Sequence, residues 1–261
     1  MTKNDVKYGD FTGLAKNYSK SRPGYSVSVL RDLIELLNKP LGEIDFVDVG
    51  AGTGIWTRMV YKEGVKSIVA IEPNQDMLSS GEADCKDTSI RWMRGTAEKT
   101  HLPACSQDWI TMASSFHWVN FDLAIREFYR ILRPGGCFTA LWNPRLIKKN
   151  GLLIEIESYL ETLAPKIKRV SSGLSGITTT LAEQLQASPY FENVVYLEDT
   201  HVTSMTPERY IMIWKSVNDI RVQLGKEKFE RFLCFVKERL NGIEKVDATY
   251  LTRAWTVSRK D

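Results

Sequence analysis

VDVGAGTG, at residues 47–54, lies between an apolar run and a segment with helical character. Residues 44–49 read as a short buried strand, and residues 55–61 as the helix that follows it. The glycines between them permit a tight turn and let a ligand come close to the backbone. A strand, a glycine turn and a helix N-terminus in this order form a site where backbone N–H groups can face a ligand. The stretch therefore predicts a ligand-binding strand–turn–helix unit.

The spacing of the glycines argues against a dinucleotide as that ligand. The fingerprint GxGxxG would need a glycine at position 55, where this chain has Ile55, and the glycine stands at Gly54. Asp48, just before the turn, is unfavourable for an anionic pyrophosphate and favours a ligand that carries positive charge. Glu72 ends the second apolar run, 22 residues past Gly50, where a carboxylate can accept hydrogen bonds from both hydroxyls of a ribose. The pattern indicates a nucleoside with a positive charge, such as a sulfonium.

Apolar runs and helical patterns alternate as far as residue 142. Helical patterns end at turn residues such as Pro134, Gly135 and Gly136. After the first strand, we expect four more at residues 67–71, 90–93, 109–113 and 137–142. Five strands that alternate with helices imply a parallel sheet with helices on both faces. The fold class is therefore predicted to be a doubly wound, Rossmann-like α/β fold.

The pattern changes after Pro144. Two more strands are expected at residues 191–202 and 249–257, which makes a mostly parallel sheet of seven strands. Thr206 supplies a hydroxyl N-cap and Pro207 the first position of a helix. Further helices are expected at residues 152–163 and 229–240. The C-terminal part thus adds a helical cap to the sheet.

The composition is that of a globular protein with balanced charge. Hydrophobic residues make up 43% and charged residues 26%, and 35 basic against 32 acidic residues give a net charge of +3. This balance does not favour a nucleic-acid partner. No apolar run approaches the roughly 20 residues of a membrane span. The four cysteines and three histidines are scattered without metal-ligand spacing, so we expect no metal and reduced thiols in a cytoplasmic protein.

Four motifs in order resemble class I S-adenosylmethionine-dependent methyltransferases. The first is VDVGAGTG, and AIEP at residues 70–73 is similar to the second. GTAE at residues 95–98, followed by Leu102-Pro103 and Asp108, is similar to the third, and ILRPGG at residues 131–136 to the turn before the fifth strand. The resemblance covers residues 11 to about 145. It implies S-adenosylmethionine as the cofactor, S-adenosylhomocysteine as its product, and no metal.

A narrower resemblance points to the branch that includes trans-aconitate methyltransferases. Phe11, Ala15, Tyr18, residues 22–25 (RPGY) and residues 115–118 (SFHW) carry it. The branch usually has a proline after the tyrosine, where this chain has Ser26. This departure puts the substrate in doubt and leaves the cofactor site intact.

The resemblance implies a set of cofactor-binding residues. Gly50, Ala51 and Gly52 would line the methionine part, and Glu72 would bind the ribose. Thr96 and Ala97 would meet the adenine edge, and Met77 its face, although a helix methionine fits a core equally well. Tyr18 and Arg22 would reach the methionine carboxylate, which the planar guanidinium can bind bidentately. Ser114, just after the fourth strand, completes the set.

His117 is the candidate catalytic residue, because its motif places it after the fourth strand, where such folds bind ligands. It would act as a base towards a hydroxyl acceptor or position an acceptor, and a structural role beside Trp118 is the alternative. Tyr25, Trp118, Trp142 and Asn143 are candidates for the acceptor pocket, although aromatic residues at strand ends are often part of the core.

These expectations combine into one domain over residues 1–261. Residues 1–25 would form an N-terminal lid, residues 26–143 the cofactor-binding core, and residues 144–261 a helical insertion on the substrate side with the last two strands. The expected reaction is methyl transfer to the carboxylate or hydroxyl oxygen of a small molecule. An RNA or protein methyltransferase and a non-catalytic cofactor-binding protein are the alternatives, and the oligomeric state is open.

Overall fold

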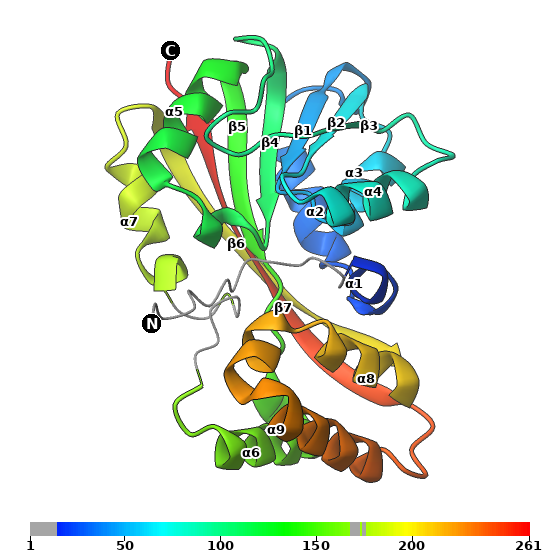
Figure 1. Cartoon of the computed structure of the whole chain (residues 1–261). Helices are drawn as coiled ribbons and strands as arrows, with labels where there is room; N and C mark the ends of the chain where they lie inside the picture. The colour runs from blue at the N-terminus through cyan, green and yellow to red at the C-terminus, as the bar shows by residue number, and fades with distance from the viewer. Residues whose placement is uncertain (1–14, 168–172, 174–175) are drawn as a thin grey trace, which may run out of the picture.

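The computed structural model describes residues 15–167, 173 and 176–261. Seven strands form one sheet in the order β3-β2-β1-β4-β5-β7-β6 (Figure 1). The first five are parallel, and β7 runs antiparallel to both β5 and β6. The predicted seven-stranded, mostly parallel sheet is confirmed. The strands are β1 (Asp45–Val49), β2 (Ser67–Ile71), β3 (Arg91–Met93), β4 (Gln107–Ala113), β5 (Leu132–Trp142), β6 (Phe191–Met205) and β7 (Val246–Arg259).

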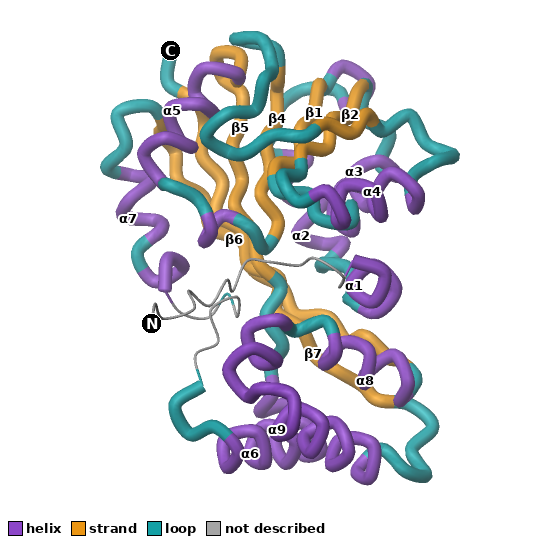
Figure 2. Tube along the Cα trace, in the orientation of Figure 1, coloured by secondary structure: helices purple, strands orange, loops and turns teal. Residues whose placement is uncertain are grey.

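Helices cover both faces of the sheet, as the alternating sequence requires (Figure 2). The helices are α1 (Ala15–Ser21), α2 (Val27–Glu35), α3 (Ile55–Lys62), α4 (Gln75–Asp84), α5 (Phe121–Ile131), α6 (Gly151–Leu163), α7 (Leu181–Gln186), α8 (Pro207–Lys215) and α9 (Asn218–Arg239). The predicted helices are present, whereas α1 and α7 lie in segments where the sequence pattern indicated none.

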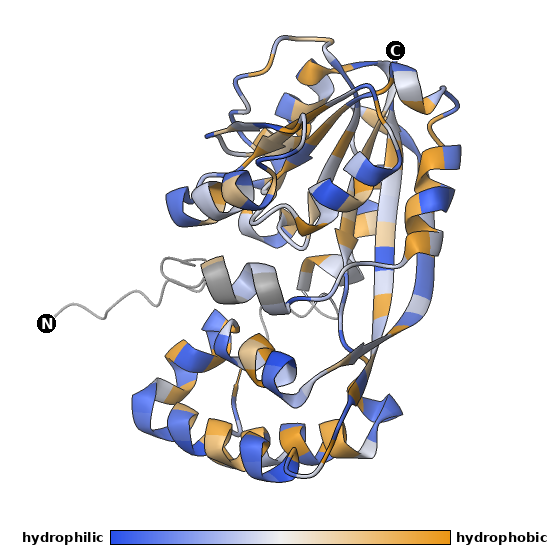
Figure 3. Cartoon of the chain, turned by 90° about the vertical axis from the view of Figure 1, so that its right-hand side faces the viewer, coloured by the Kyte–Doolittle hydropathy of each residue, from blue (hydrophilic) through white to orange (hydrophobic). Residues whose placement is uncertain are grey.

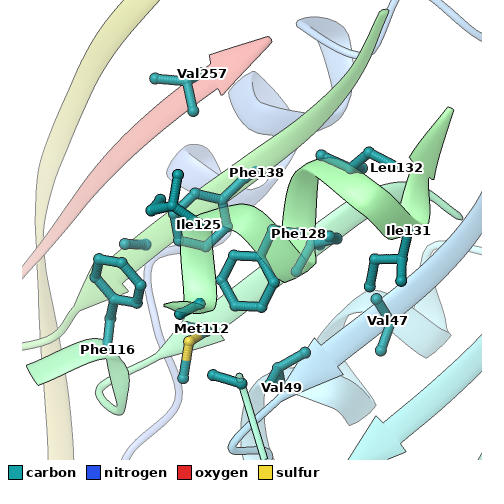
Figure 4. Close-up of a cluster of buried hydrophobic side chains, with 14 of the residues drawn as sticks. Val47, Val49, Met112, Phe116, Ile125, Phe128, Ile131, Leu132, Phe138 and Val257 are labelled. Carbon is teal, nitrogen blue, oxygen red and sulfur yellow. The ribbon is translucent and has the colours of Figure 1, made fainter. Parts of the chain in front are cut away.

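Alternate residues of each central strand face two different cores. Val47 and Val49 of β1 pack with α5 and α7 on one face, and Phe46 packs with α2 and α3 on the other. Figure 4 shows the first core, where Phe128 and Ile131 of α5 lie over Phe138 of β5 and the β1 valines. Burial on both faces explains why these strands read as continuous apolar runs.

The fifth strand begins earlier than predicted and includes the LRPGG segment. Residues 133–136 do not end the helix in a free turn but belong to the start of β5, with a bulge opposite β4 between Gln107 and Trp109. Arg133 fixes this bulge by donating to Asp108 (2.7 Å) and Asp45 (3.0 Å), the first residue of β1. The motif therefore ties three strands together at the amino end of the parallel sheet.

The cap is built on two long strands. β5 pairs only with residues 253–258 of β7, whereas β6 pairs with β7 along nearly its whole length. The remaining part of the β6–β7 ribbon extends past the sheet and carries α8 and α9, with α6 packed against them (Figure 1). Hydrophilic and hydrophobic residues alternate along these helices (Figure 3), as expected of helices with one buried face. Their apolar faces form a third core around Trp214, Phe232 and Tyr250.

Helix α9 of the cap is kinked. Gly225 interrupts it with a left-handed φ of 69°, so the predicted amphipathic stretch at residues 229–240 lies in its second half. Among the described residues, no helix is both long and apolar enough to cross a bilayer.

The N-terminal helix α1 lies between α4 and α8. Ser19 donates to Asp84 at the end of α4. Arg209 of α8 donates to the backbone oxygens of Ser21 (3.1 Å) and Arg22 (3.4 Å). The helix is thus bonded both to the sheet layer and to the cap. Phe11 and the rest of residues 1–14 lie outside the described residues.

The predicted cap of α8 gives a test of this local structure. Thr206 has extended backbone, and its side chain accepts a hydrogen bond from the Arg209 N–H (3.3 Å). Thr206→Ala should lower the free energy of unfolding by about 0.5–2 kcal/mol in urea titrations, because that N–H loses its partner. The control is Thr162→Ala on the exposed side of α6, which should change it by about 0.5 kcal/mol or less. Equal effects would contradict the capping role.

Candidate functional site

A cavity of about 400 Å³ opens at the carboxyl ends of β1, β2 and β4. The order of the strands reverses between β1 and β4, and ligands of open α/β sheets bind at such a point. Its size fits a small-molecule site. The cavity is lined by Tyr18, Tyr25, Gly50, Ala51, Gly52, Thr53, Ile55, Trp56, Glu72, Pro73, Asn74, Met77, Thr96, Ala97, Glu98, Met112, Ala113, Ser114, Ser115, Trp118 and Val119.

The glycine turn needs its glycines for close packing. Gly50, with φ of 68°, lies so near Ser115 that a Cβ there would be 2.8 Å from the serine side chain. The N–H groups of Gly50 and Ala51 both donate to the carbonyl of Ile71, at 2.8 and 3.0 Å. The Gly52 N–H donates to Glu72 (2.8 Å). The donors expected to face a ligand are therefore used within the protein.

This internal pairing decides between two kinds of nucleotide. A pyrophosphate binds at a glycine turn through free backbone N–H groups. Here the N–H groups of Gly50, Ala51 and Gly52 already have partners, so these three groups are not free to bind a phosphate. The arrangement agrees with the sequence argument against a dinucleotide.

Glu72 joins the end of β2 to this turn. Besides Gly52, it accepts a hydrogen bond from the Asn74 N–H (2.9 Å), which starts α4. Burial raises the pKa of Glu72, and the two backbone hydrogen bonds oppose that rise. Each carboxylate oxygen keeps a further lone pair, and the side chain lines the cavity. Glu72 can therefore accept hydrogen bonds from a ligand.

Asp48 does not meet the cavity, contrary to the sequence expectation that it favours a cationic ligand there. Its side chain is 0% exposed and is absent from the lining. One oxygen accepts from Thr57 (2.6 Å) and the other from Thr111 (3.0 Å). Burial is the main cause that raises the pKa of Asp48 to about 7. Its role is inside the protein.

The loop after β3 forms another wall. Thr96 and Lys99 exchange two backbone hydrogen bonds, which folds residues 96–99 into a tight turn. Glu98 accepts from the Asn120 N–H (2.9 Å) and lines the cavity with Thr96 and Ala97. Met77 of α4 is 3% exposed and also lines it. The structure thus brings these four predicted or neighbouring residues to the same cavity as the glycine turn.

Tyr25 and Ser114 meet at the opposite wall. Their hydroxyls share a hydrogen bond of 2.9 Å. Ser114 has a left-handed φ of 55°, which is unusual for a serine and is held by a hydrogen bond from its N–H to Leu141 (2.7 Å). Burial raises the pKa of the Tyr25 phenol above its usual range, so it stays protonated. The pair offers neutral hydroxyl groups to a ligand.

Arg22 was expected on the cofactor and does not line the cavity. Its Nε donates to Ser216 at the end of α8 (3.1 Å), and its guanidinium lies 4.9 Å from the ring centre of Tyr18. Tyr18 itself lines the cavity. The arginine therefore bonds the cap and supports Tyr18 from behind.

His117 lies behind the wall and not in it. Its Nδ1 accepts a hydrogen bond from the Trp142 indole (3.2 Å), which requires that the proton of the neutral ring be on Nε2. Nε2 is buried and has no partner among the described residues. Burial lowers the pKa of His117 to about 4. A ring in this form has no free lone pair, so the geometry does not supply the predicted general base.

Of the other candidates for the acceptor pocket, Trp118 lines the cavity, whereas Trp142 and Asn143 do not. Trp118 lines the cavity and is 39% exposed at its edge. Trp142 is 1% exposed within the core, and Asn143 donates to the Gly24 carbonyl (2.8 Å) and accepts from Thr252 (2.9 Å). Trp142 bonds His117 and packs against Trp255 of β7, and Asn143 joins the N-terminal segment to β7.

Several lining residues were not predicted. Trp56 and Ile55 follow the glycine turn, Ser115 begins the SFHW stretch and Val119 follows it. Their places after strands were readable from the sequence, but which side chains turn inward was not. Among the described lining residues, the ionisable side chains are Tyr18, Tyr25, Glu72 and Glu98. No cluster of three potential metal ligands occurs in residues 15–167, 173 and 176–261.

Comparisons with known proteins agree on one family. Residues 47–140 match the model of a methyltransferase domain. An uncharacterized methyltransferase of Mycobacterium tuberculosis is 34% identical over 128 residues, which are 49% of this chain and 49% of that protein, so the chain spans about half the length of that relative. An uncharacterized methyltransferase of Schizosaccharomyces pombe is 28% identical over 92% of this chain and 93% of its own length.

A solved structure supports the fold. A candidate type II methyltransferase from Anaeromyxobacter dehalogenans superposes with a TM-score of 0.63 at 18% identity, over 90% of this chain and 97% of that one. At this identity the likeness concerns the fold alone. It places the seven-stranded sheet among Rossmann-like methyltransferase folds.

The buried state of His117 predicts how stability changes with pH. His117→Ala should cost about 1–3 kcal/mol at pH 7.5, because the Trp142 N–H is left unpaired. The folded pKa of about 4 lies below the unfolded value of 6.5. The contribution of the neutral histidine is therefore complete above pH 6.5 and is lost as the pH falls towards 4, by at most about 1.4 kcal/mol per pH unit.

Urea titrations of both proteins between pH 4 and 8 measure this difference. The control is His101→Asn, which replaces an exposed histidine outside the His117–Trp142 contact. A wild-type advantage that grows on acidification would contradict the neutral tautomer.

Proposed function

We propose that this chain, whose residues 47–140 match the model of a methyltransferase domain, binds S-adenosylmethionine and transfers its methyl group to a small molecule. One observation carries the proposal. The Gly52 N–H donates to the carboxylate of Glu72, and the N–H groups of Gly50 and Ala51 donate to the carbonyl of Ile71. Such a site suits a nucleoside without phosphates, because it offers acceptors for ribose hydroxyls and close approach along the glycines.

The proposed binding residues follow the cavity wall. Glu72 accepts from the ribose, Thr96 and Ala97 meet the adenine edge, and Met77 packs on its face. Gly50, Ala51 and Gly52 line the methionine part together with Tyr18. When bound, S-adenosylmethionine would supply a methyl group whose carbon an acceptor atom attacks in line, with the neutral thioether of S-adenosylhomocysteine as the leaving group. The aromatic side chains around this end exclude water, which favours the displacement.

The acceptor end is assigned to Tyr25, Ser114 and Trp118. Tyr25 and Ser114 offer hydroxyls that orient an oxygen of the acceptor, and Trp118 covers the edge of the cavity. An ionised carboxylate acceptor needs no base, whereas a hydroxyl must release a proton. Because His117 is not placed to take that proton, we favour an oxygen of low pKa, such as a carboxylate. This would be O-methylation of a small-molecule acid.

The organisation proposed from the sequence is retained with one change. Residues 1–25 remain the lid and residues 26–143 the cofactor-binding core. The cap within residues 144–261 contributes none of the described cavity residues and instead holds α1, through Arg22 and Arg209. The cap therefore acts on the site through the lid.

Isothermal titration calorimetry tests the cofactor. S-adenosylhomocysteine should bind and NAD should not, because the N–H groups of Gly50, Ala51 and Gly52 already have partners within the protein. Tight binding of NAD without binding of S-adenosylhomocysteine would overturn the proposal.

Glu72→Ala should weaken S-adenosylhomocysteine by about 1–3 kcal/mol, which is about 5- to 150-fold in the dissociation constant, since charged hydrogen bonds are lost. The control is Glu82→Ala on the exposed side of α4, which should leave the affinity unchanged. An unchanged affinity in Glu72→Ala would remove this residue from the site.

The lid predicts a change in hydrogen exchange. Tyr18 lines the cavity on a seven-residue helix, so ligand contact should stabilise that helix. Amides of residues 15–25 should exchange more slowly with S-adenosylhomocysteine bound, whereas amides in the second half of α9 should not change. Equal exchange of residues 15–25 in both states would indicate a fixed structural segment.

A further inference from the structure

Trp56 forms part of the cavity wall and is fixed from inside the protein. Its side chain is 1% exposed, and its Nε1 donates to the hydroxyl of Thr111 at 3.0 Å. Thr111 lies in the middle of β4 and is 0% exposed. A buried indole N–H that had no acceptor would be unfavourable, so this bond sets the orientation of the ring.

The direction of the hydrogen bonds is determined by the chemistry of the groups. An indole N–H can only donate, so Thr111 accepts from Trp56 and its own proton goes to Asp48 (3.0 Å). The second oxygen of Asp48 accepts from Thr57 in the first turn of α3 (2.6 Å). Asp48 is thus the last acceptor in this series of hydrogen bonds. It fixes both Thr111 and the helix that carries Trp56.

Trp56 in turn contacts Tyr25. The two rings lie edge to face, with centroids 5.3 Å apart and planes at 73°. The phenol of Tyr25 then reaches Ser114, 2.9 Å away, at the end of the same strand that carries Thr111. Asp48, Thr111, Trp56 and Tyr25 therefore form a continuous series of contacts from the core to the cavity.

We propose that Asp48 and Thr111 are positioning residues that act through Trp56 to hold the Tyr25 phenol against Ser114. The significance of Tyr25 for the acceptor rests on the proposed function, whereas the series of contacts does not. The acidic residue of the first motif thereby shapes the acceptor end of the cavity without touching a ligand. Loss of the Thr111 hydroxyl frees the indole, and the Tyr25 ring loses its fixed neighbour.

A matched pair in the same sheet separates positioning from simple stability. Trp109 donates to Thr139 at 3.0 Å, and Thr139 is also 0% exposed. This indole–threonine bond has the same chemistry as the Trp56–Thr111 bond. Trp109 and Thr139 do not line the cavity, and Trp109 contacts the Trp56 ring edge to face, with centroids 6.3 Å apart. Thr139→Val therefore controls for the loss of a buried indole acceptor.

The experiment uses the full chain labelled with 3-fluorotyrosine and observed by ¹⁹F NMR, with the Tyr25 signal identified by its loss in Tyr25→Phe. Thr111→Val should shift or broaden the Tyr25 signal, because the ring samples more than one position. Thr111→Ser, which keeps the hydroxyl, and Thr139→Val should leave it unchanged. If Thr111→Val does not fold, Thr111→Cys replaces the hydroxyl by a weak acceptor and should shift the signal in the same way.

An unchanged Tyr25 signal in Thr111→Val or Thr111→Cys would overturn the proposal, and so would an equal change in Thr139→Val. Calorimetry on the same proteins keeps this result apart from the proposed function. The titrant is S-adenosylhomocysteine, which the wild-type protein should bind. Failure of the wild type to bind it would overturn the proposed function and leave the positioning result intact.

Discussion

The carbonyl of Ile71 and the carboxylate of Glu72 hold the glycine turn in place, and the rest of the site depends on this connection. Ile71 and Glu72 end β2, and they receive three consecutive N–H groups from the turn that ends β1. Two parallel strands are thereby joined at their carboxyl ends by side chain and backbone together. The joint fixes where α3 begins, and α3 brings Trp56 to the cavity.

Much of the fold was predictable because it follows from local patterns. Each central strand is buried on both faces, so it appears as an apolar run whatever its partners are. The N-cap of α8 was predictable from Thr206 and Pro207, because a helix cap is formed by residues that are adjacent in the sequence. The helix α1 was not, because its few apolar residues give no periodic pattern and it is held by bonds from α4 and α8.

The site was predictable in part. The glycine turn, Glu72 and residues 96–98 belong to short motifs and line one cavity, and their contacts with a ligand stay a prediction. Arg22, Asp48 and His117 were assigned to a ligand, yet each has a protein partner that is distant in sequence: Ser216, Thr111 and Trp142 respectively. No motif records such partners. A charged or ionisable side chain near a motif can serve the framework as well as the ligand.

The β6–β7 ribbon has a mechanical consequence. Past Trp142, β6 and β7 continue into the cap as a ribbon with residues 144–146 bonded beside β7, and two-stranded ribbons carry more twist than wider sheets. The cap is bonded to α1 through Arg22 and Arg209, and α1 carries Tyr18. A rotation of the ribbon would therefore move a wall of the cavity. The cap and this wall of the cavity are thus mechanically coupled through α1.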